Sequence, residues 1–135
     1  MLVEDNPDDE LLTIRALKKN NIVNEVIVAR DGAEALELLL NDETKNYPEQ
    51  LPQLILLDLK LPKVDGLEVL KALRSDSRTQ TIPVVILSTS IEEEDICKGY
   101  MNGANSYIRK PVDFNEFTEA VRQIGGYWLL LNKSI

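Results

Sequence analysis

The chain contains no histidine and only one cysteine, Cys97, among its 135 residues. Without imidazole it cannot build a Ser-His-Asp or Cys-His catalytic centre, and it has no histidine to ligate a metal or carry a phosphate. A single cysteine cannot form an internal disulfide, which is typical of a protein of the reducing cytoplasm. Any chemistry must therefore rely on carboxylates, hydroxyls, lysine or a bound metal ion.

Positive charge and long apolar runs are also scarce. The formal net charge of −8 argues against binding to nucleic acid or to an anionic membrane, because both require a cationic surface. No run approaches the roughly 18 apolar residues of a membrane span, and the N-terminus does not resemble a signal peptide. The length and the apolar fraction of 44% are typical of one globular domain.

Apolar segments of strand length alternate with segments of helical periodicity along most of the chain. Strands are predicted at residues 1–5, 25–29, 54–58, 82–88 and 105–110. Helices are predicted at 7–20, 32–40, 66–74, 92–101 and from 113 to the Gly125–Gly126 pair, and a long loop at 41–53. Five strands with intervening helices predict an α/β fold with a doubly wound parallel sheet covered on both faces.

Local signals refine this prediction. Asn6 and Asp31 are predicted N-caps of the first two helices, and Gly66 is expected to serve a turn after Asp65. Four apolar residues are assigned to the inner face of the first helix: Leu11, Leu12, Ile14 and Leu17.

Polar residues of the apolar strands collect at the carboxyl ends, namely Glu4, Asp5, Asp58, Ser88 and Lys110. In a doubly wound sheet these ends lie at one edge, where ligands bind. Two carboxylates about 4 Å apart repel by roughly 4 kcal/mol at an effective dielectric near 20. A divalent cation relieves this repulsion, and an oxygen-only ligand set favours Mg²⁺. Lys110 and Ser88 suit contacts to a phosphoryl group.

Each of these residues also has a simpler structural interpretation. Glu4 and Asp5 alone would charge a helix start, Asp58 alone would be a turn residue, and Ser88 and Lys110 alone would be surface or capping groups. The joint pattern favours a site that holds phosphate on or beside a carboxylate, because chance would rarely load four strand ends in this way.

Four segments resemble the receiver domain of two-component response regulators: "LVEDN", "LILLDLKLPKVDG", "PVVILSTS" and "YIRKP". The resemblance extends from Leu2 to about Ile124. It implies a CheY-like (flavodoxin-like) three-layer sandwich with strand order 2-1-3-4-5. It divides the chain into a receiver domain at residues 1–125 and an apolar tail at 126–135.

By this resemblance Asp58 is the phosphoacceptor, which takes a phosphoryl group from a histidine of a sensor histidine kinase. Glu4 and Asp5 would bind Mg²⁺, together with Asp58 and the main-chain carbonyl of Lys60. Lys110 would contact the phosphoryl oxygens. The resemblance thus assigns a role to each polar residue at the strand ends.

The resemblance also implies a switch. Ser88 would move toward the phosphoryl group and Tyr107 would turn inward with it, although a half-buried strand aromatic is the alternative interpretation of Tyr107. Phosphorylation adds nearly two negative charges at the acceptor, which would bias a two-state element. The responsive surface would comprise the helix at 92–101, the strand at 105–110 and the last helix.

Rival functions fit the sequence less well. A phosphatase of the haloacid-dehalogenase type requires a second acid two residues after its nucleophile, where this chain has Lys60. A flavodoxin-like FMN carrier requires a loop rich in glycine and hydroxyls after the first strand, where this chain has the acidic "EDNPDDE". The remaining alternative is a pseudo-receiver that binds a partner without phosphorylation.

Two further segments indicate a subgroup. The loop "NDETKNYPEQLPQ" and the tail "GGYWLLLNKSI" resemble the small response regulators that pair with bacterial phytochrome-type kinases. The apolar tail residues Tyr127, Trp128 and Leu129 either fold back over their own domain or form a homodimer contact. Since no output domain follows and the first strand looks clipped, we expect a single-domain regulator or a receiver excised from a longer chain.

Overall fold

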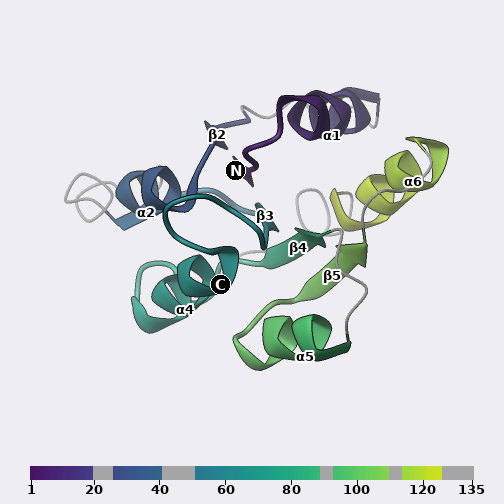
Figure 1. Cartoon of the computed structure of the whole chain (residues 1–135). Coiled ribbons are helices and arrows are strands. Elements are labelled where there is room, and N and C mark those ends of the chain that lie inside the picture. Colours follow the sequence, from purple (N-terminus) through teal and green to yellow (C-terminus); the bar gives the residue numbers. More distant parts are fainter. Residues whose placement is uncertain (20–25, 41–50, 89–92, 110–113, 126–135) are drawn as a thin grey trace.

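The computed structural model describes residues 1–19, 26–40, 51–88, 93–109 and 114–125. The strands form one parallel sheet in the order β2-β1-β3-β4-β5 (Figure 1). They are β1 (Leu2–Val3), β2 (Val28–Ala29), β3 (Ile55–Asp58), β4 (Val84–Ser88) and β5 (Ser106–Arg109). The helices are α1 (Pro7–Lys19), α2 (Gly32–Leu40), α4 (Gly66–Ser75), α5 (Glu93–Met101) and α6 (Phe114–Gly125). The predicted fold and strand order are confirmed.

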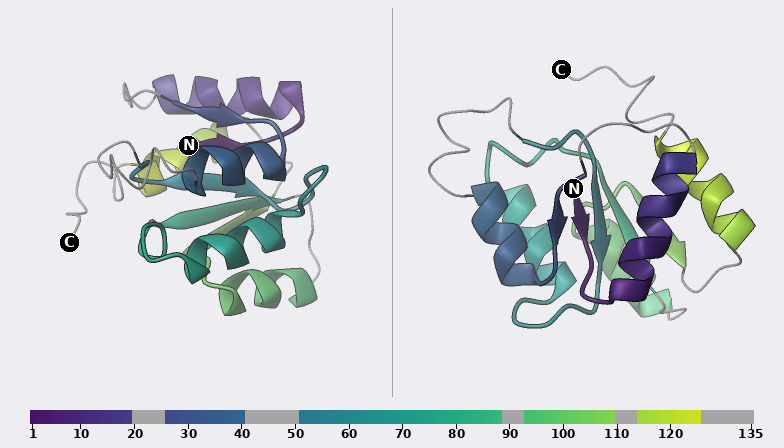
Figure 2. Two further views of the ribbon diagram at one scale, coloured as in Figure 1. Left: turned by 90° about the vertical axis from the view of Figure 1, so that its left-hand side faces the viewer. Right: turned by 90° about the horizontal axis from the view of Figure 1, so that it is seen from above.

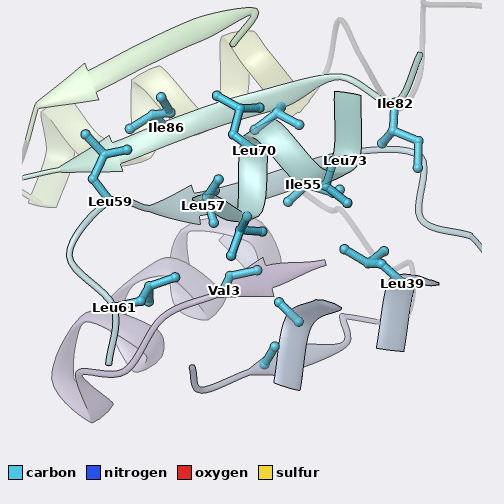
Figure 3. Packing of buried hydrophobic residues seen from close by; sticks show 14 residues of the cluster. Val3, Leu39, Ile55, Leu57, Leu59, Leu61, Leu70, Leu73, Ile82 and Ile86 are labelled. Atoms are coloured by element: carbon cyan, nitrogen blue, oxygen red, sulfur yellow. The ribbon is translucent and has the colours of Figure 1, made fainter. Parts of the chain in front are cut away.

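The molecule has three layers, with the sheet in the middle. Helices α1 and α6 cover one face, and α2, α4 and α5 cover the other (Figure 2). Because successive side chains of a strand point to opposite faces, the apolar strands supply both cores. Leu2, Leu56 and Val85 pack toward α1, whereas Leu57 and Ile86 belong to the larger core beneath α2 and α4 (Figure 3).

Register brings the carboxyl ends of the central strands to one edge of the sheet. Val3 pairs with Leu57, and Asp58 pairs with Leu87. The residues that directly follow β1 therefore lie beside Asp58, at the edge where β4 ends at Ser88. Parallel pairing thus creates the juxtaposition that the strand-end residues predict.

The predicted helix caps are confirmed at the same edge. The Asn6 side-chain oxygen accepts the backbone N–H groups of Asp8 (2.9 Å) and Asp9 (3.2 Å). The Asp31 carboxylate accepts the backbone N–H of Glu34 at 2.7 Å. These bonds satisfy donors that a helix start leaves without intrahelical partners, and they begin α1 and α2 next to the acidic residues.

One predicted core assignment is wrong. Leu11 is 51% exposed, while the buried residues of α1 are Thr13, Ala16 and Leu17. At 3.6 residues per turn, Leu11 lies well away from the stripe that these three residues form. The inner face of α1 is therefore narrower and less apolar than the run of leucines indicates.

The strands are shorter than predicted, β1 mainly at its end and the others at their starts. β1 ends at Val3, so Glu4 and Asp5 follow the strand instead of ending it, and β2 comprises only Val28–Ala29. Pairing begins at Ile55, Val84 and Ser106 in the other strands, because ladder contacts and not apolar composition set the ends. Predictions for 20–25, 41–50, 89–92, 110–113 and 126–135 lie outside the described residues. None of the helices in the described ranges has the length and hydropathy to span a bilayer.

Candidate functional site

Three carboxylates converge at the carboxyl edge of the sheet. Glu4, Asp5 and Asp58 each place one oxygen within 4.8 Å of the oxygens of the other two. Glu4 is buried at 1% exposure, Asp58 is half-buried and Asp5 is exposed. The predicted convergence of these three acids is confirmed.

The donor set of this cluster fits a divalent cation. Three carboxylates offer hard oxygen ligands, which Mg²⁺, Ca²⁺ and Mn²⁺ prefer. The burial of Glu4 within a like-charged group supports this fit, since a buried carboxylate is costly unless a positive charge or a proton compensates it. Within the described part of the chain, this is the one group of acids close enough to share an ion.

The backbone after Asp58 bends back toward its carboxylate. The Lys60 N–H donates to Asp58 Oδ1 at 3.3 Å, while Lys60 itself is exposed. Gly66 is the first residue of α4, as the predicted helix at 66–74 requires, and a Cβ there would lie 2.3 Å from the Asp58 carbonyl oxygen. Glycine is therefore required for the close approach of α4 to the carboxyl end of β3.

The loop between β3 and α4 is also held against α2. A Cβ on Gly32 would lie 1.9 Å from the Val64 carbonyl oxygen. Lys63 adopts a left-handed φ of 67°, and its Nζ lies 3.5 Å from Asp31 Oδ2. The backbone N–H of Glu34 and the nearby Lys63 ammonium hold the pKa of Asp31 below its usual value of 3.8. Sequence patterns did not identify these contacts; the "DG" pairs at 31–32 and 65–66 were the available signal.

The two predicted switch residues occupy adjacent strands. Ser88 is fully buried at the carboxyl end of β4. Tyr107 in β5 pairs in register with Ile86 and lies half-buried against the larger core. A Cβ on Gly99 of α5 would lie 3.6 Å from Tyr107 Cδ2, so α5 lies directly over this ring. Lys110 and the tail residues Tyr127, Trp128 and Leu129 lie outside the described residues.

Comparison with known families assigns the chain. Residues 1–122 match the model of the response regulator receiver domain. The chain belongs to the response regulator receiver family. The receiver domain accounts for the parallel sheet, its strand order and the acidic edge in one architecture.

Several relatives resemble this receiver domain over nearly its full length. Response regulator Rcp1 from Synechocystis sp. is 39% identical over 96% of this chain and 87% of the relative. A solved structure of the Mn²⁺-bound form of response regulator Rcp1 has a TM-score of 0.84 and 36% identity, covering 99% of this chain and 96% of that one.

Two further solved structures are response regulators of phytochromes. The phosphorylated cyanobacterial phytochrome response regulator RcpA has a TM-score of 0.86 and 42% identity, covering 98% of this chain and 94% of that one. The bacteriophytochrome response regulator AtBRR has a TM-score of 0.74 and 50% identity, covering 98% and 95%.

Proposed function

We propose that this receiver domain accepts a phosphoryl group on Asp58 from a histidine of a sensor kinase, in a reaction that requires Mg²⁺. The observation that carries the proposal is the cluster of three carboxylates within 4.8 Å at the edge of the sheet. The phosphorylated RcpA and the Mn²⁺-bound Rcp1 support it as relatives of similar structure.

In the proposed reaction, a carboxylate oxygen of Asp58 attacks the phosphorus atom. The P–N bond to the kinase histidine breaks, and the imidazole nitrogen keeps the electron pair. The Lys60 N–H fixes Asp58 Oδ1 and so orients the carboxylate. Glu4, Asp5, Asp58 and the main-chain carbonyl of Lys60 would hold Mg²⁺, which offsets negative charge on the carboxylates and the phosphoryl oxygens. Lys110 would contact those oxygens, as the family resemblance implies.

The proposed output is a change in the surface formed by α5, β5 and α6. The phosphoryl group brings nearly two negative charges and new acceptor oxygens. Ser88, at the end of β4, would become their hydrogen-bond donor, and Tyr107 would turn inward beneath α5. Hydrolysis of the acyl phosphate by the domain itself would reset the switch, so the domain is a signalling module with limited phosphoryl chemistry and not a turnover enzyme.

Acetyl phosphate tests the proposal without the kinase. Incubation with Mg²⁺ should add one phosphoryl group, measured by intact mass, and the adduct should be lost in base and absent when EDTA replaces Mg²⁺. Asp58→Asn should show no adduct, whereas Asp65→Asn, an exposed acid outside the cluster, should be labelled like the wild type.

Two results would redirect the assignment. Labelling of the Asp58→Asn variant would move the acceptor elsewhere. Absence of any adduct, with acetyl phosphate and with an active histidine kinase alike, would favour the pseudo-receiver that binds its partner without phosphorylation.

The proposed partner is a phytochrome-type sensor histidine kinase in the cytoplasm, since the related RcpA and AtBRR are response regulators of phytochromes. We further propose that the tail residues Tyr127, Trp128 and Leu129 form a homodimer contact. Trp128→Ala should then lower the mass measured by light scattering from dimer to monomer, and Trp128→Phe should retain the dimer. A dimer mass for Trp128→Ala would exclude the tail as the main contact.

A further inference from the structure

Helix α5 ends in a hydrogen-bonded cap. The Gly103 N–H donates to the Tyr100 carbonyl and the Ala104 N–H to the Gly99 carbonyl, both at 3.0 Å. Gly103 has a left-handed φ of 103°, so the pair of bonds forms a Schellman motif. This motif satisfies carbonyls that a helix end leaves exposed and gives α5 a defined C-terminal end.

The side chain of Arg74 binds this end of α5 to α4. Its Nη2 donates to the Gly103 carbonyl at 2.8 Å and to Asn105 Oδ1 at 3.1 Å, and its Nε donates to the Gly103 carbonyl at 3.0 Å. Its Nη1 donates to the Ile82 carbonyl at 2.8 Å and to the Gln80 carbonyl at 3.0 Å. One planar guanidinium therefore joins the end of α4, the turn before β4 and the turn after α5.

The same turn is also paired with the start of β4. The backbone N–H of Asn105 donates to the Val84 carbonyl at 2.8 Å, and the Asn105 side-chain oxygen accepts the Val84 N–H at 2.9 Å. A Cβ on Gly103 would lie 2.8 Å from Arg74 Nε, so the guanidinium lies directly against the turn. Several bonds from three segments thus hold the C-terminal end of α5.

The rest of α5 lies over the proposed switch. Four residues separate Glu93, where α5 begins, from Ser88 at the acidic edge. In the middle of the contact, Gly99 brings the helix backbone against Ile86 and Tyr107. A helix of nine residues is about 13 Å long, so a rotation of about 5° around one end moves the other by about 1 Å.

We propose that α5 turns as a lever about its C-terminal end, and that the bonds of Arg74 to Gly103 and Asn105 form the pivot. This inference rests on the proposed function, which supplies the driving charge at Asp58. A shift at the acidic edge would move the start of α5 and the part that covers Tyr107, while the turn at 102–105 stays fixed. Arg74 is then a positioning residue for the switch, remote from the phosphoacceptor at the opposite edge of the sheet.

Amide hydrogen exchange measured by NMR tests the pivot, with the phosphoryl adduct quantified by mass in the same samples. In the wild-type chain, acetyl phosphate with Mg²⁺ should change exchange at residues 97–98 by about threefold or more, and at 103–105 by less than about twofold. Arg74→Met should accelerate exchange at 103–105 by about tenfold before phosphorylation, and phosphorylation should then alter those amides too. Arg74→Lys keeps the positive charge but lacks the planar guanidinium with its several donors, so it should give an intermediate response. It replaces Arg74→Met in the comparison if that variant does not fold.

Arg78 provides the matched control. Like Arg74 it is half-buried, but it follows α4. It binds Asp76 at 2.9 Å and the Leu40 carbonyl of α2 at 3.2 Å. Arg78→Met should keep wild-type exchange at 103–105. Equal changes at both ends of α5 in a fully phosphorylated wild-type chain, or the same exchange at 103–105 in both methionine variants, would overturn the lever alone. A chain that forms no adduct would overturn the proposed function and the lever with it.

Discussion

Replacing Asp58 by asparagine is expected to stabilise the metal-free domain while abolishing its proposed activity. Oxygens of Asp58, Glu4 and Asp5 lie within 4.8 Å of one another. At this separation and an effective dielectric near 20, one pair of like charges costs about 3.5 kcal/mol. Water screens the exposed Asp5, so the buried Glu4 contributes most of the repulsion. Since asparagine has the same shape and keeps the acceptor for the Lys60 N–H, we expect a gain of about 2 kcal/mol in the free energy of unfolding.

Urea unfolding in EDTA and in excess Mg²⁺ measures this effect. Asp65→Asn is the control, because it removes one negative charge outside the cluster and Asp65 makes no side-chain cap bond. In EDTA, Asp58→Asn should be more stable than the wild type, and the control should lie within about 0.5 kcal/mol of it. Mg²⁺ at one hundred times its dissociation constant should add about 2.7 kcal/mol to the wild type and much less to Asp58→Asn.

The two conditions separate the possible errors in this reasoning. If Asp58→Asn and Asp65→Asn are equally stable in EDTA, the three carboxylates do not repel one another as strongly as the calculation requires. If Mg²⁺ stabilises Asp58→Asn as much as the wild type, Asp58 is not a ligand and the proposed metal site is wrong.

Three further predictions test the structure around the site. Gly66→Ala should lower the free energy of unfolding by about 2–3 kcal/mol, because its Cβ would meet a backbone oxygen at 2.3 Å. Gly99→Ala should lower it by less than about 1 kcal/mol, because its Cβ would meet a side-chain methyl that can rotate away. The opposite order of stability in urea unfolding would contradict the packing described. Because the pKa of Asp31 is lowered from 3.8 in the folded chain, its contribution to stability is present above about pH 4 and disappears as the pH falls through the lower folded value. Asp31→Asn should therefore weaken the pH dependence of unfolding in this acidic range. Acid unfolding monitored by circular dichroism measures this, and the same curve for Asp31→Asn and the wild type would refute the role given to Asp31. Leu11→Ala should leave the free energy of unfolding within about 0.5 kcal/mol of the wild type, while Leu17→Ala should lower it by about 2–4 kcal/mol. Equal losses for the two variants would show that Leu11 is part of the core.

Sequence reasoning was most successful where the signal is local or follows from parallel sheets. The periodicity predicted the order of the elements, and short polar residues before helical segments predicted the caps at Asn6 and Asp31. The acids at strand ends were also predictable, because parallel strands that follow one another through helices must all end at the same edge. The exact ends of the elements and the exposure of Leu11 were not predictable, since the identity of an apolar residue does not indicate which neighbour will bury it.

The amino-acid sequence alone therefore determined the fold class and the set of acids that meet at one edge, and the family resemblance implied the order of the strands. Tertiary structure decided how closely those parts approach. The Gly66 backbone lies against the carbonyl of Asp58, and the Arg74 guanidinium binds a carbonyl 29 residues away in the chain. Periodicity and capping depend on neighbours within a few residues, whereas these contacts join segments that only folding brings together, so their distances and strengths are set by packing.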